Sequence, residues 1–177
     1  MNLSGRTFDM HARNAIVIAE KPSAFDSKAI DEFVALVLVG GEVLAQGLRD
    51  RVLQAESIAL LKKDDQLLGV AGLKRPTRSH RAEVFERSRT VLDAKEFLLE
   101  LGWVYVVPIA RGQGHSLPLC SAVVDAATGS GVFATSRVEN HGMHRTLAQL
   151  GFDRVGREWP LQQNQGNLAL FVRPDGA

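Results

Sequence analysis

Apolar residues change their spacing along the chain in a way that predicts alternating strands and helices. Residues 14–19 form a short, β-branched apolar run closed by Lys21 and Pro22, which predicts a first strand. After Ser23 the apolar positions follow a helical period that ends at a pair of glycines, and a second helical stripe comes next. The two stripes are Ile30, Phe33, Val34 and Val37, and then Val43, Leu44, Leu48 and Val52.

The middle of the chain predicts a hairpin, a surface loop and a central strand. Residues 57–61 and 67–73 are apolar runs that flank an Asp-Asp pair suited to a tight turn. Residues 74–89 are basic and aperiodic, so we expect a surface loop with at most a short helix around residues 82–87. Residues 96–107 carry apolar side chains on both faces, as expected of a strand that is covered on both sides.

The last third of the chain continues the alternation. In chain order it predicts a helix at 116–127, a strand at 132–138, a helix at 141–150, and two strands at 152–158 and 168–172 joined by a Gln/Asn-rich turn at 162–167. The whole order is β-α-α-β-β-β-α-β-α-β-β. Because no internal repeat or linker interrupts it, we expect one α/β domain over residues 1–177.

The overall composition argues against a nucleic-acid partner, a membrane partner and a membrane span. A chain of 177 residues, 45% of them hydrophobic and 23% charged, has the size and composition of one globular domain. The 21 Lys and Arg nearly balance the 20 Asp and Glu, so no global field favours nucleic acid or an anionic membrane. The longest apolar stretch, residues 33–39, is far too short for a membrane span, and residues 1–6 have no apolar run behind them. We therefore expect a cytoplasmic protein without a membrane partner.

The sequence also argues against structural metal and disulfide chemistry. Cys120 is the only cysteine, which excludes an internal disulfide and a cysteine-rich zinc site. His141 and His144 are three residues apart on a predicted helix, but no third ligand with a fitting spacing accompanies them. We expect no metal.

A glycine loop between a strand and a helix is the strongest candidate for chemistry. Gly112 and Gly114 let a ligand approach the backbone, and the first N–H groups of the following helix attract anions. Pro118 places the start of that helix near Ser116, whose hydroxyl either caps the helix or meets a phosphate. Arg111 adds a permanent positive charge. The pattern is neither a dinucleotide fingerprint nor a P-loop. The alternative is a simple strand-to-helix turn that binds no ligand.

These residues resemble the signature of the GNAT acetyltransferase superfamily, V-x-P-x-x-[RQ]-x-x-G-x-[GA] before a helix. The matching positions are Val106, Pro108, Arg111, Gly114 and Ser116, with serine where the family prefers Gly or Ala. A second family pattern is an Asn at a strand exit followed by Gly-Phe eleven and twelve positions later, and Asn140, Gly151 and Phe152 satisfy it. The resemblance is best over residues 96–172 and implies a single-domain GNAT-like fold, a mixed splayed β-sheet flanked by helices.

The resemblance also implies a site for coenzyme A. The backbone of residues 103–107, including Val104 and Val106, would pair with the pantetheine arm. The amides of the loop would hold the pyrophosphate; its residues are Arg111, Gly112, Gln113, Gly114, His115 and Ser116. Asn140 would hydrogen-bond the pantetheine, and it can equally cap the following helix.

Transfer to an amine needs a base and a group that stabilises the developing oxyanion. Glu100 is the first candidate for the base, because period-two alternation places it on one face with Gly102, Val104 and Val106. Its alternative role is a salt-bridge partner, and Glu96 is the second candidate for the base. The amide of Val106 is our candidate for the oxyanion.

The usual general acid of the family, a tyrosine seven residues after the Asn, is Leu147 here. A water, Ser121, Cys120 or His144 could replace it, or the thiolate leaves unaided. The chain's one tyrosine, Tyr105, is expected in the core.

We therefore predict an N-acyltransferase that moves an acyl group, most often acetyl, from acetyl-CoA to a primary amine by direct attack. The alternative is a coenzyme A-binding sensor or regulatory domain, which Leu147 motivates. A third reading, a nucleic-acid-binding domain using residues 74–81, is disfavoured by the balanced charge. The acceptor remains open among peptide N-termini, lysines, polyamines and aminoglycosides, and so does homodimer formation.

Overall fold

The computed structural model describes residues 15–161 and 166–176. Its strands are β1 (Ile16–Glu20), β2 (Ser57–Lys63), β3 (Gln66–Lys74), β4 (Leu99–Val106), β5 (Val132–Arg137), β6 (Asp153–Pro160) and β7 (Asn167–Arg173). Its α-helices are α1 (Ser27–Val39), α2 (Leu48–Leu53), α3 (Arg78–Ser88), α4 (Ser116–Val124) and α5 (His141–Gln149), and short 3-10 turns occur at Pro22–Ala24, Ala94–Glu96 and Pro108–Ala110. Asn14 and most of the expected turn at 162–167 lie outside the described residues.

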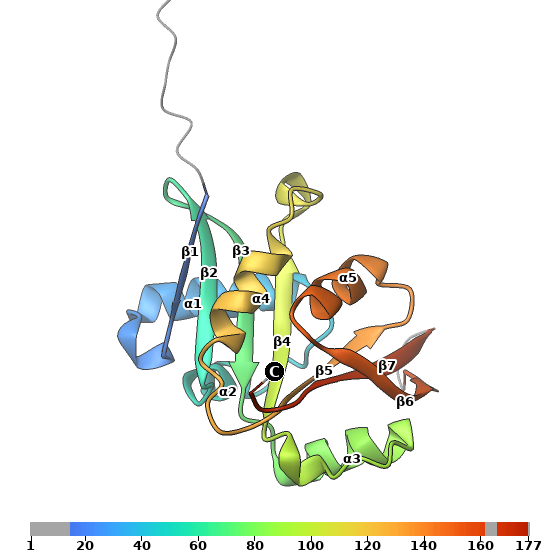
Figure 1. Cartoon of the computed structure of the whole chain (residues 1–177). Coiled ribbons are helices and arrows are strands. Elements are labelled where there is room, and N and C mark those ends of the chain that lie inside the picture. Colours follow the sequence, from blue (N-terminus) through green and yellow to red (C-terminus); the bar gives the residue numbers. More distant parts are fainter. Residues whose placement is uncertain (1–14, 162–165, 177) are drawn as a thin grey trace, which may run out of the picture.

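The described strands form one sheet in the order β1-β2-β3-β4-β5-β7-β6 (Figure 1). All neighbours are antiparallel except β4 and β5, which run parallel. The parallel pair is short, since only residues 99–101 of β4 pair with residues 132–134 of β5. Beyond Leu101 the two strands diverge, and β5 continues beside β7. The predicted mixed, splayed sheet is confirmed.

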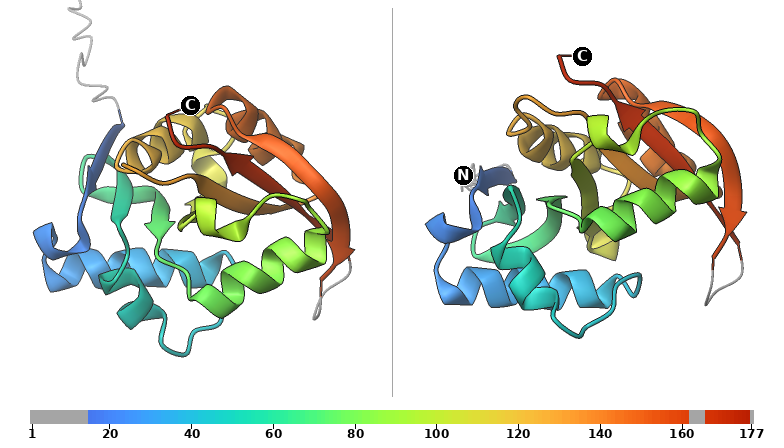
Figure 2. Two further views of the ribbon diagram at one scale, coloured as in Figure 1. Left: turned by 60° about the horizontal axis from the view of Figure 1, so that its bottom comes forward. Right: turned by 90° about the horizontal axis from the view of Figure 1, so that it is seen from below.

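Helices cover both faces of the sheet (Figure 2). On one face, α4 packs across β1 to β4 and contacts α5, around buried side chains such as Leu119, Val123 and Leu147. On the other face, α1 and α2 cover the β1–β4 half, and α3 covers β6 and β7. The divergence of β4 and β5 therefore has α1 on one side and α3 on the other, and both helices lie on the face opposite α4.

The most important difference from the sequence prediction is α3. Residues 78–88 form a helix of 11 residues rather than a loop with a short helical piece. Thr77 caps it by accepting a hydrogen bond from the N–H of His80 at 3.2 Å. The helix buries Val84 and Phe85. The ring of Phe85 contacts Phe133 of β5 and Phe97, which precedes β4, and Val84 belongs to the same buried cluster. Two buried apolar residues are too few to show a helical period, so tertiary packing stabilises this helix.

Two element boundaries also differ from the prediction. The second helix begins at Leu48, after Gly47 in the left-handed region, so Val43 and Leu44 lie in the preceding loop instead of on a buried stripe. Leu44 is 72% exposed. The central strand begins at Leu99 instead of residue 96, because residues 94–96 form a 3-10 turn capped by Asp93. The β2–β3 hairpin is confirmed, with Asp64 in its turn at φ 53°.

A β-bulge in β4 changes which side chains share a face. Val70 pairs with Tyr105 and Gly72 with Gly102, so one residue of β3 faces two residues of β4. Trp103, at the bulge, has φ 53°. As a result, side-chain alternation along β4 is out of phase before and after the bulge.

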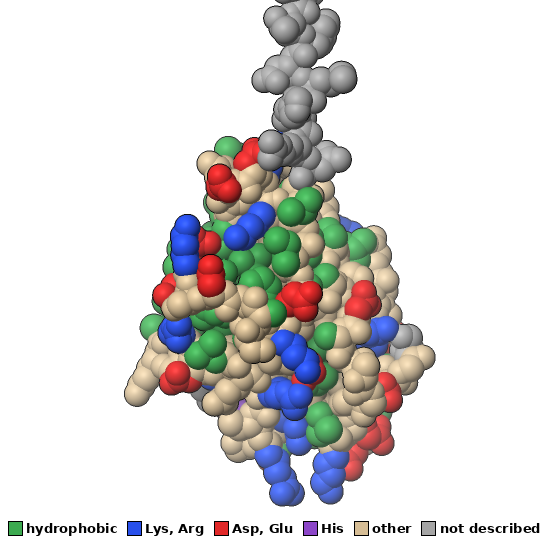
Figure 3. Space-filling view, turned by 90° about the vertical axis from the view of Figure 1, so that its left-hand side faces the viewer, with side chains coloured by type: hydrophobic (Ala, Val, Ile, Leu, Met, Phe, Trp, Pro, Cys, Tyr) green, Lys and Arg blue, Asp and Glu red, His purple; other side chains and the backbone are tan. Residues whose placement is uncertain are grey.

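The edge strand β1 exposes apolar side chains to solvent. Ile16 and Ile18 are 57% and 39% exposed, and both lie on this edge strand. Figure 3 views this side of the molecule and shows hydrophobic side chains together, with acidic and basic groups spread around them. No helix found among the described residues is long and apolar enough to span a membrane.

Candidate functional site

The divergence of β4 and β5 exposes backbone groups of β4 that a regular sheet would pair. The N–H of Val107 donates to Leu68 O of β3 at 2.9 Å, and Tyr105 is paired with Val70. Because backbone groups of successive residues point to opposite edges of a strand, the N–H and C=O of Val106 point toward the gap on the β5 side. The gap, which we call the fork, therefore presents hydrogen-bonding groups for an extended ligand.

The loop that follows β4 leaves its amides accessible. Gly112 and Gly114 have φ 75° and 79°, and a Cβ at either position would meet nothing within 4 Å. The helix α4 begins at Ser116, with His115 as its N-cap and no side-chain cap. In the described part of the chain, the N–H groups of residues 112–117 make no backbone hydrogen bond outside regular elements. The prediction that Ser116 caps α4 is wrong, because Ser116 is the first helical residue.

Arg111 joins the loop to the end of β4. Its Nε donates to Val106 O at 2.9 Å, and its guanidinium carbon lies 5.3 Å from the centre of the Tyr105 ring. The positive charge is thus held at the open end of the fork. Tyr105 is half-buried at the fork rather than enclosed in the core.

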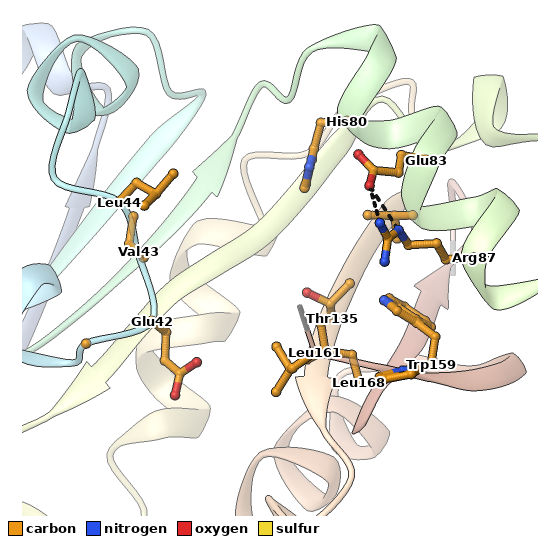
Figure 4. A pocket seen from close by; sticks show the side chains of 13 residues that line it. Glu42, Val43, Leu44, His80, Glu83, Arg87, Thr135, Trp159, Leu161 and Leu168 are labelled. Atoms are coloured by element: carbon orange, nitrogen blue, oxygen red, sulfur yellow. Dashed lines mark hydrogen bonds and ion pairs between the residues drawn. The ribbon is translucent and has the colours of Figure 1, made fainter. Parts of the chain in front are cut away.

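Two adjacent cavities lie around the fork. The fork cavity has a volume of about 300 Å³ and is lined by residues 101–105 of β4, by the end of β5, and by Asn140 and Met143. The outer cavity has a volume of about 460 Å³ and lies between the loop after α1, α3 and the β6–β7 strands (Figure 4). The two cavities share the lining residues Glu42, Val43, Thr135, Leu161 and Leu168, so they lie side by side.

The family of the chain follows from its sequence as a whole. Residues 30–152 match the model of the acetyltransferase (GNAT) family. The chain belongs to the GNAT acetyltransferase family. No curated protein sequence matches it significantly.

Solved structures share this GNAT fold at low sequence identity. An acyl-CoA N-acyltransferase from Pseudomonas aeruginosa aligns with a TM-score of 0.65 and 16% identity, over 90% of this chain and 99% of that one. NAA60 of Arabidopsis thaliana in complex with acetyl-CoA aligns with a TM-score of 0.64 and 14% identity, over 93% and 100%. NAA60 in complex with a bisubstrate analogue gives a TM-score of 0.63 at 14% identity, over 91% and 99%. At these identities the likeness establishes the fold.

The predicted residues of the GNAT signature follow one another along β4 and into the loop after it. Val104 lines the fork cavity, Val106 is the last residue of β4, and the loop from Arg111 leads to Ser116, the first residue of α4. Asn140 caps α5 by accepting a hydrogen bond from the N–H of Met143 at 3.0 Å, and it also lines the fork cavity. The capping role is confirmed, while a contact of Asn140 with a ligand stays a prediction.

Glu100 does not share a face with Val104 and Val106, contrary to the prediction. Those two valines pack with the cluster under α4, whereas the Glu100 side chain contacts Lys74 and the α3 side of the sheet. The β-bulge at Trp103 is the reason, because it shifts the alternation between Glu100 and Val104.

Glu100 is a buried, ion-paired carboxylate. Its Oε1 lies 2.6 Å from Lys74 Nζ and its Oε2 lies 3.3 Å from His80 Nε2, and its side chain is 6% exposed. Burial raises the pKa of the carboxyl, but the charge of Lys74 and the contacts with His80 outweigh it and leave the pKa below its usual value of 4.5. Glu100 is therefore an anion at neutral pH. Its role as a general base stays a prediction.

The position of the usual acid and most of the residues considered as its replacement are buried or already make contacts within the protein. Leu147 is fully buried in the core beneath α4. Cys120 is also buried, and burial raises the pKa of its thiol to about 12. His144 Nε2 lies 3.0 Å from Arg137 O, and its ring packs on Phe171 with 4.8 Å between centroids. Ser121 is half-buried on α4.

The basic stretch at residues 74–81 is used within the protein. Lys74 pairs with Glu100, and Arg75 forms an ion pair with Glu56. Thr77 starts α3, which brings His80 to the outer cavity. His80 is the residue that sequence reasoning missed, because its contact with Glu100 depends on how α3 packs against the sheet.

Proposed function

We propose that this GNAT protein transfers an acyl group, most often acetyl, from acyl-CoA to a primary amine by direct attack. The observation that carries the proposal is the fork, with the Val106 amide facing it and the exposed amides of residues 112–117 at its end. A diphosphate fits the exposed amides, and an extended pantetheine fits the backbone edge of β4. The surroundings of Gly112 and Gly114 support this proposal, since a Cβ at either position would meet nothing within 4 Å.

The residues divide into donor and acceptor roles. Arg111, Gly112, Gln113, Gly114, His115 and Ser116 would hold the pyrophosphate, and the backbone of Val104 and Val106 would hold the pantetheine, with Asn140 beside it. Bound acyl-CoA supplies an activated thioester carbonyl at the fork. The N–H of Val106 would stabilise the negative charge that develops on that carbonyl oxygen. The amine would enter through the outer cavity, which adjoins the fork cavity at Thr135.

Thiol release in the presence of acetyl-CoA and a panel of amines tests the proposal. We expect turnover with at least one class of amine and a KM for acetyl-CoA in the range of about 1 μM to 1 mM. Calorimetric titration with coenzyme A should give saturable heat. Absence of heat would reject the proposal.

A coenzyme A-binding sensor remains the second candidate, because Leu147 stands where the family's acid is expected. Tight binding of coenzyme A with no thiol release across peptides, lysine, polyamines and aminoglycosides would favour the sensor. Turnover with any of these amines would favour the enzyme.

A further inference from the structure

His80 projects from α3 into the outer cavity (Figure 4). It lies in the first turn of the helix, where its N–H is held by the Thr77 hydroxyl. Its side chain is 49% exposed. The imidazole is thus anchored through its backbone, while its ring remains open to a molecule in the cavity.

The carboxylate of Glu100 contacts the imidazole of His80 and restrains its orientation. His80 Nε2 lies 3.3 Å from Glu100 Oε2, and the other carboxylate oxygen is occupied by Lys74 at 2.6 Å. A neutral imidazole that donates its Nε2 proton to a carboxylate keeps Nδ1 as a proton acceptor.

The pair lies at the start of the fork. Glu100 occupies a paired position of β4, and pairing with β5 ends at the next residue, Leu101. On β5 the first residue not paired with β4 is Thr135, which lines both cavities. An amine held in the outer cavity would therefore have the imidazole of His80 in one wall and Thr135 at the boundary with the fork cavity.

We propose that His80 is the catalytic base that takes the proton from the acceptor's ammonium group, and that Glu100 is its positioning residue. This inference rests on the proposed function and names the group that prepares the nucleophile at the same site. It differs from direct catalysis by Glu100, whose carboxylate is buried between Lys74 and His80.

The proton balance of the step is complete. An ammonium group gives one proton to His80 Nδ1 and becomes a neutral amine, whose nitrogen attacks the thioester carbonyl carbon. The C–N bond forms, the C–S bond breaks, and a second proton from the nitrogen passes to the departing sulfur, directly or through water. One hydrogen remains on the amide when the amine is primary. The imidazolium of His80 returns its proton to solvent, to which its ring is open.

Other charged groups around the outer cavity are already paired. Glu83 and Arg87 on α3 form an ion pair at 2.8 Å, and Glu42 from the loop after α1 is bound by an arginine of β5. The lowered pKa of Glu100 makes its carboxylate a weak base toward an alkylammonium ion. Among the described residues that line this cavity, His80 therefore offers an exposed ring nitrogen, Nδ1, that can accept a proton from an amine.

Comparing two acceptor amines of similar size distinguishes proton removal by His80 from its other possible roles. Ethylamine is protonated at neutral pH, whereas trifluoroethylamine is mostly neutral because its fluorines withdraw electron density. With acetyl-CoA as donor, we expect His80→Ala to reduce kcat/KM for ethylamine by about 100-fold or more. The loss with trifluoroethylamine should be below about fivefold, because that amine needs no base. Added imidazole should restore part of the ethylamine rate of His80→Ala.

Control variants test the positioning role and the helix. Glu100→Gln should lower the ethylamine rate less than His80→Ala does and should not respond to imidazole. Glu86→Gln, at an exposed position of α3, should leave both rates unchanged. In His80→Gln, which keeps a polar side chain, the rate with ethylamine should rise with pH as the amine itself loses its proton, so the ratio of wild-type to variant rate should be largest near neutral pH and shrink at alkaline pH.

The outcomes distinguish this inference from the proposed function. Equal losses with the two amines, or no loss with either, in a His80→Ala protein that still binds acetyl-CoA would overturn the role of His80 alone. A wild-type protein that binds no coenzyme A, or releases no thiol with any amine, would overturn the proposed function and the base with it.

Discussion

Glu42 and Arg137 form a two-point ion pair that joins the loop after α1 to the end of β5. Arg137 Nε and Nη2 donate to the two carboxylate oxygens of Glu42 at 3.0 and 3.2 Å. Glu42 lines both the fork cavity and the outer cavity. The pair therefore connects the two sides of the cleft at the place where donor and acceptor would meet.

Glu42→Gln should affect the acceptor more than the stability of the fold. Both side chains are partly exposed, so the free energy of unfolding should change by less than about 1 kcal/mol. The loop that carries Val43 loses its anchor, and the KM for the acceptor amine should rise several-fold. Steady-state kinetics and urea unfolding measure the two effects. As a control, Glu32→Gln breaks the Lys28–Glu32 pair on α1 and should change neither. An unchanged acceptor KM in Glu42→Gln would contradict the anchoring role.

Gly112→Ala should weaken binding of acetyl-CoA by about tenfold. In the proposed binding mode, the new Cβ would crowd a pyrophosphate that approaches the loop amides. Gly129→Ala is a matched control, since Gly129 also has a positive φ, 70° against 75°, and open surroundings. Each alanine adds backbone strain of about 1–2 kcal/mol, so both should unfold at similarly lower urea concentrations. Equal dissociation constants for the two variants by calorimetry would show that the loop does not hold the ligand.

Cys120→Ala should retain thiol release within about twofold of the wild type, because a thiol with a pKa near 12 supplies little thiolate nucleophile at neutral pH. The side chain is fully buried under the sheet, and its truncation should lower the free energy of unfolding by about 1 kcal/mol. The wild-type thiol should react with a disulfide reagent only after unfolding. Loss of turnover in a folded Cys120→Ala protein would instead indicate a covalent acyl-enzyme.

Glu100→Gln should lower stability in a pH-dependent way. The folded pKa of Glu100 lies below its usual value of 4.5, so the stabilisation is present above that value and disappears as the pH falls through the folded pKa. At neutral pH the substitution leaves Lys74 without its buried partner, and we expect a loss of about 3 kcal/mol. Urea titrations should show the difference between wild type and variant shrinking as the pH falls from neutral to about 3. A constant difference over that range would disagree with an ionised Glu100.

Gly156→Ala should displace the end of α3. Gly156 in β6 has φ 67°, and a Cβ there would lie 2.3 Å from the carbonyl oxygen of Ser88. Strain and overlap together should lower the free energy of unfolding by about 2–4 kcal/mol. Gly176→Ala has a similar φ in open space and should be much milder. Thermal unfolding compares the two, and similar midpoints would mean that α3 is not seated on β6.

Local signals in the sequence predicted the loop that we propose as the cofactor site. Gly112, Gly114 and Pro118 act within a few residues of one another, and their effect on the backbone depends little on distant contacts. The strands of the sheet were also readable, since apolar runs and the turn at Asp64 are local signals. The strand and helix order was therefore correct except at α3.

Only the tertiary structure decided where the proposed catalytic residues lie. The bulge at Trp103 has no signal in a one-dimensional pattern, yet it moves Glu100 to the face opposite Val106. The helix α3 forms because Val84 and Phe85 find partners on distant strands, and it carries His80 to Glu100 across 20 positions of sequence. Contacts between segments far apart in the chain are set by how sheet and helices pack, so residue spacing alone could not predict them.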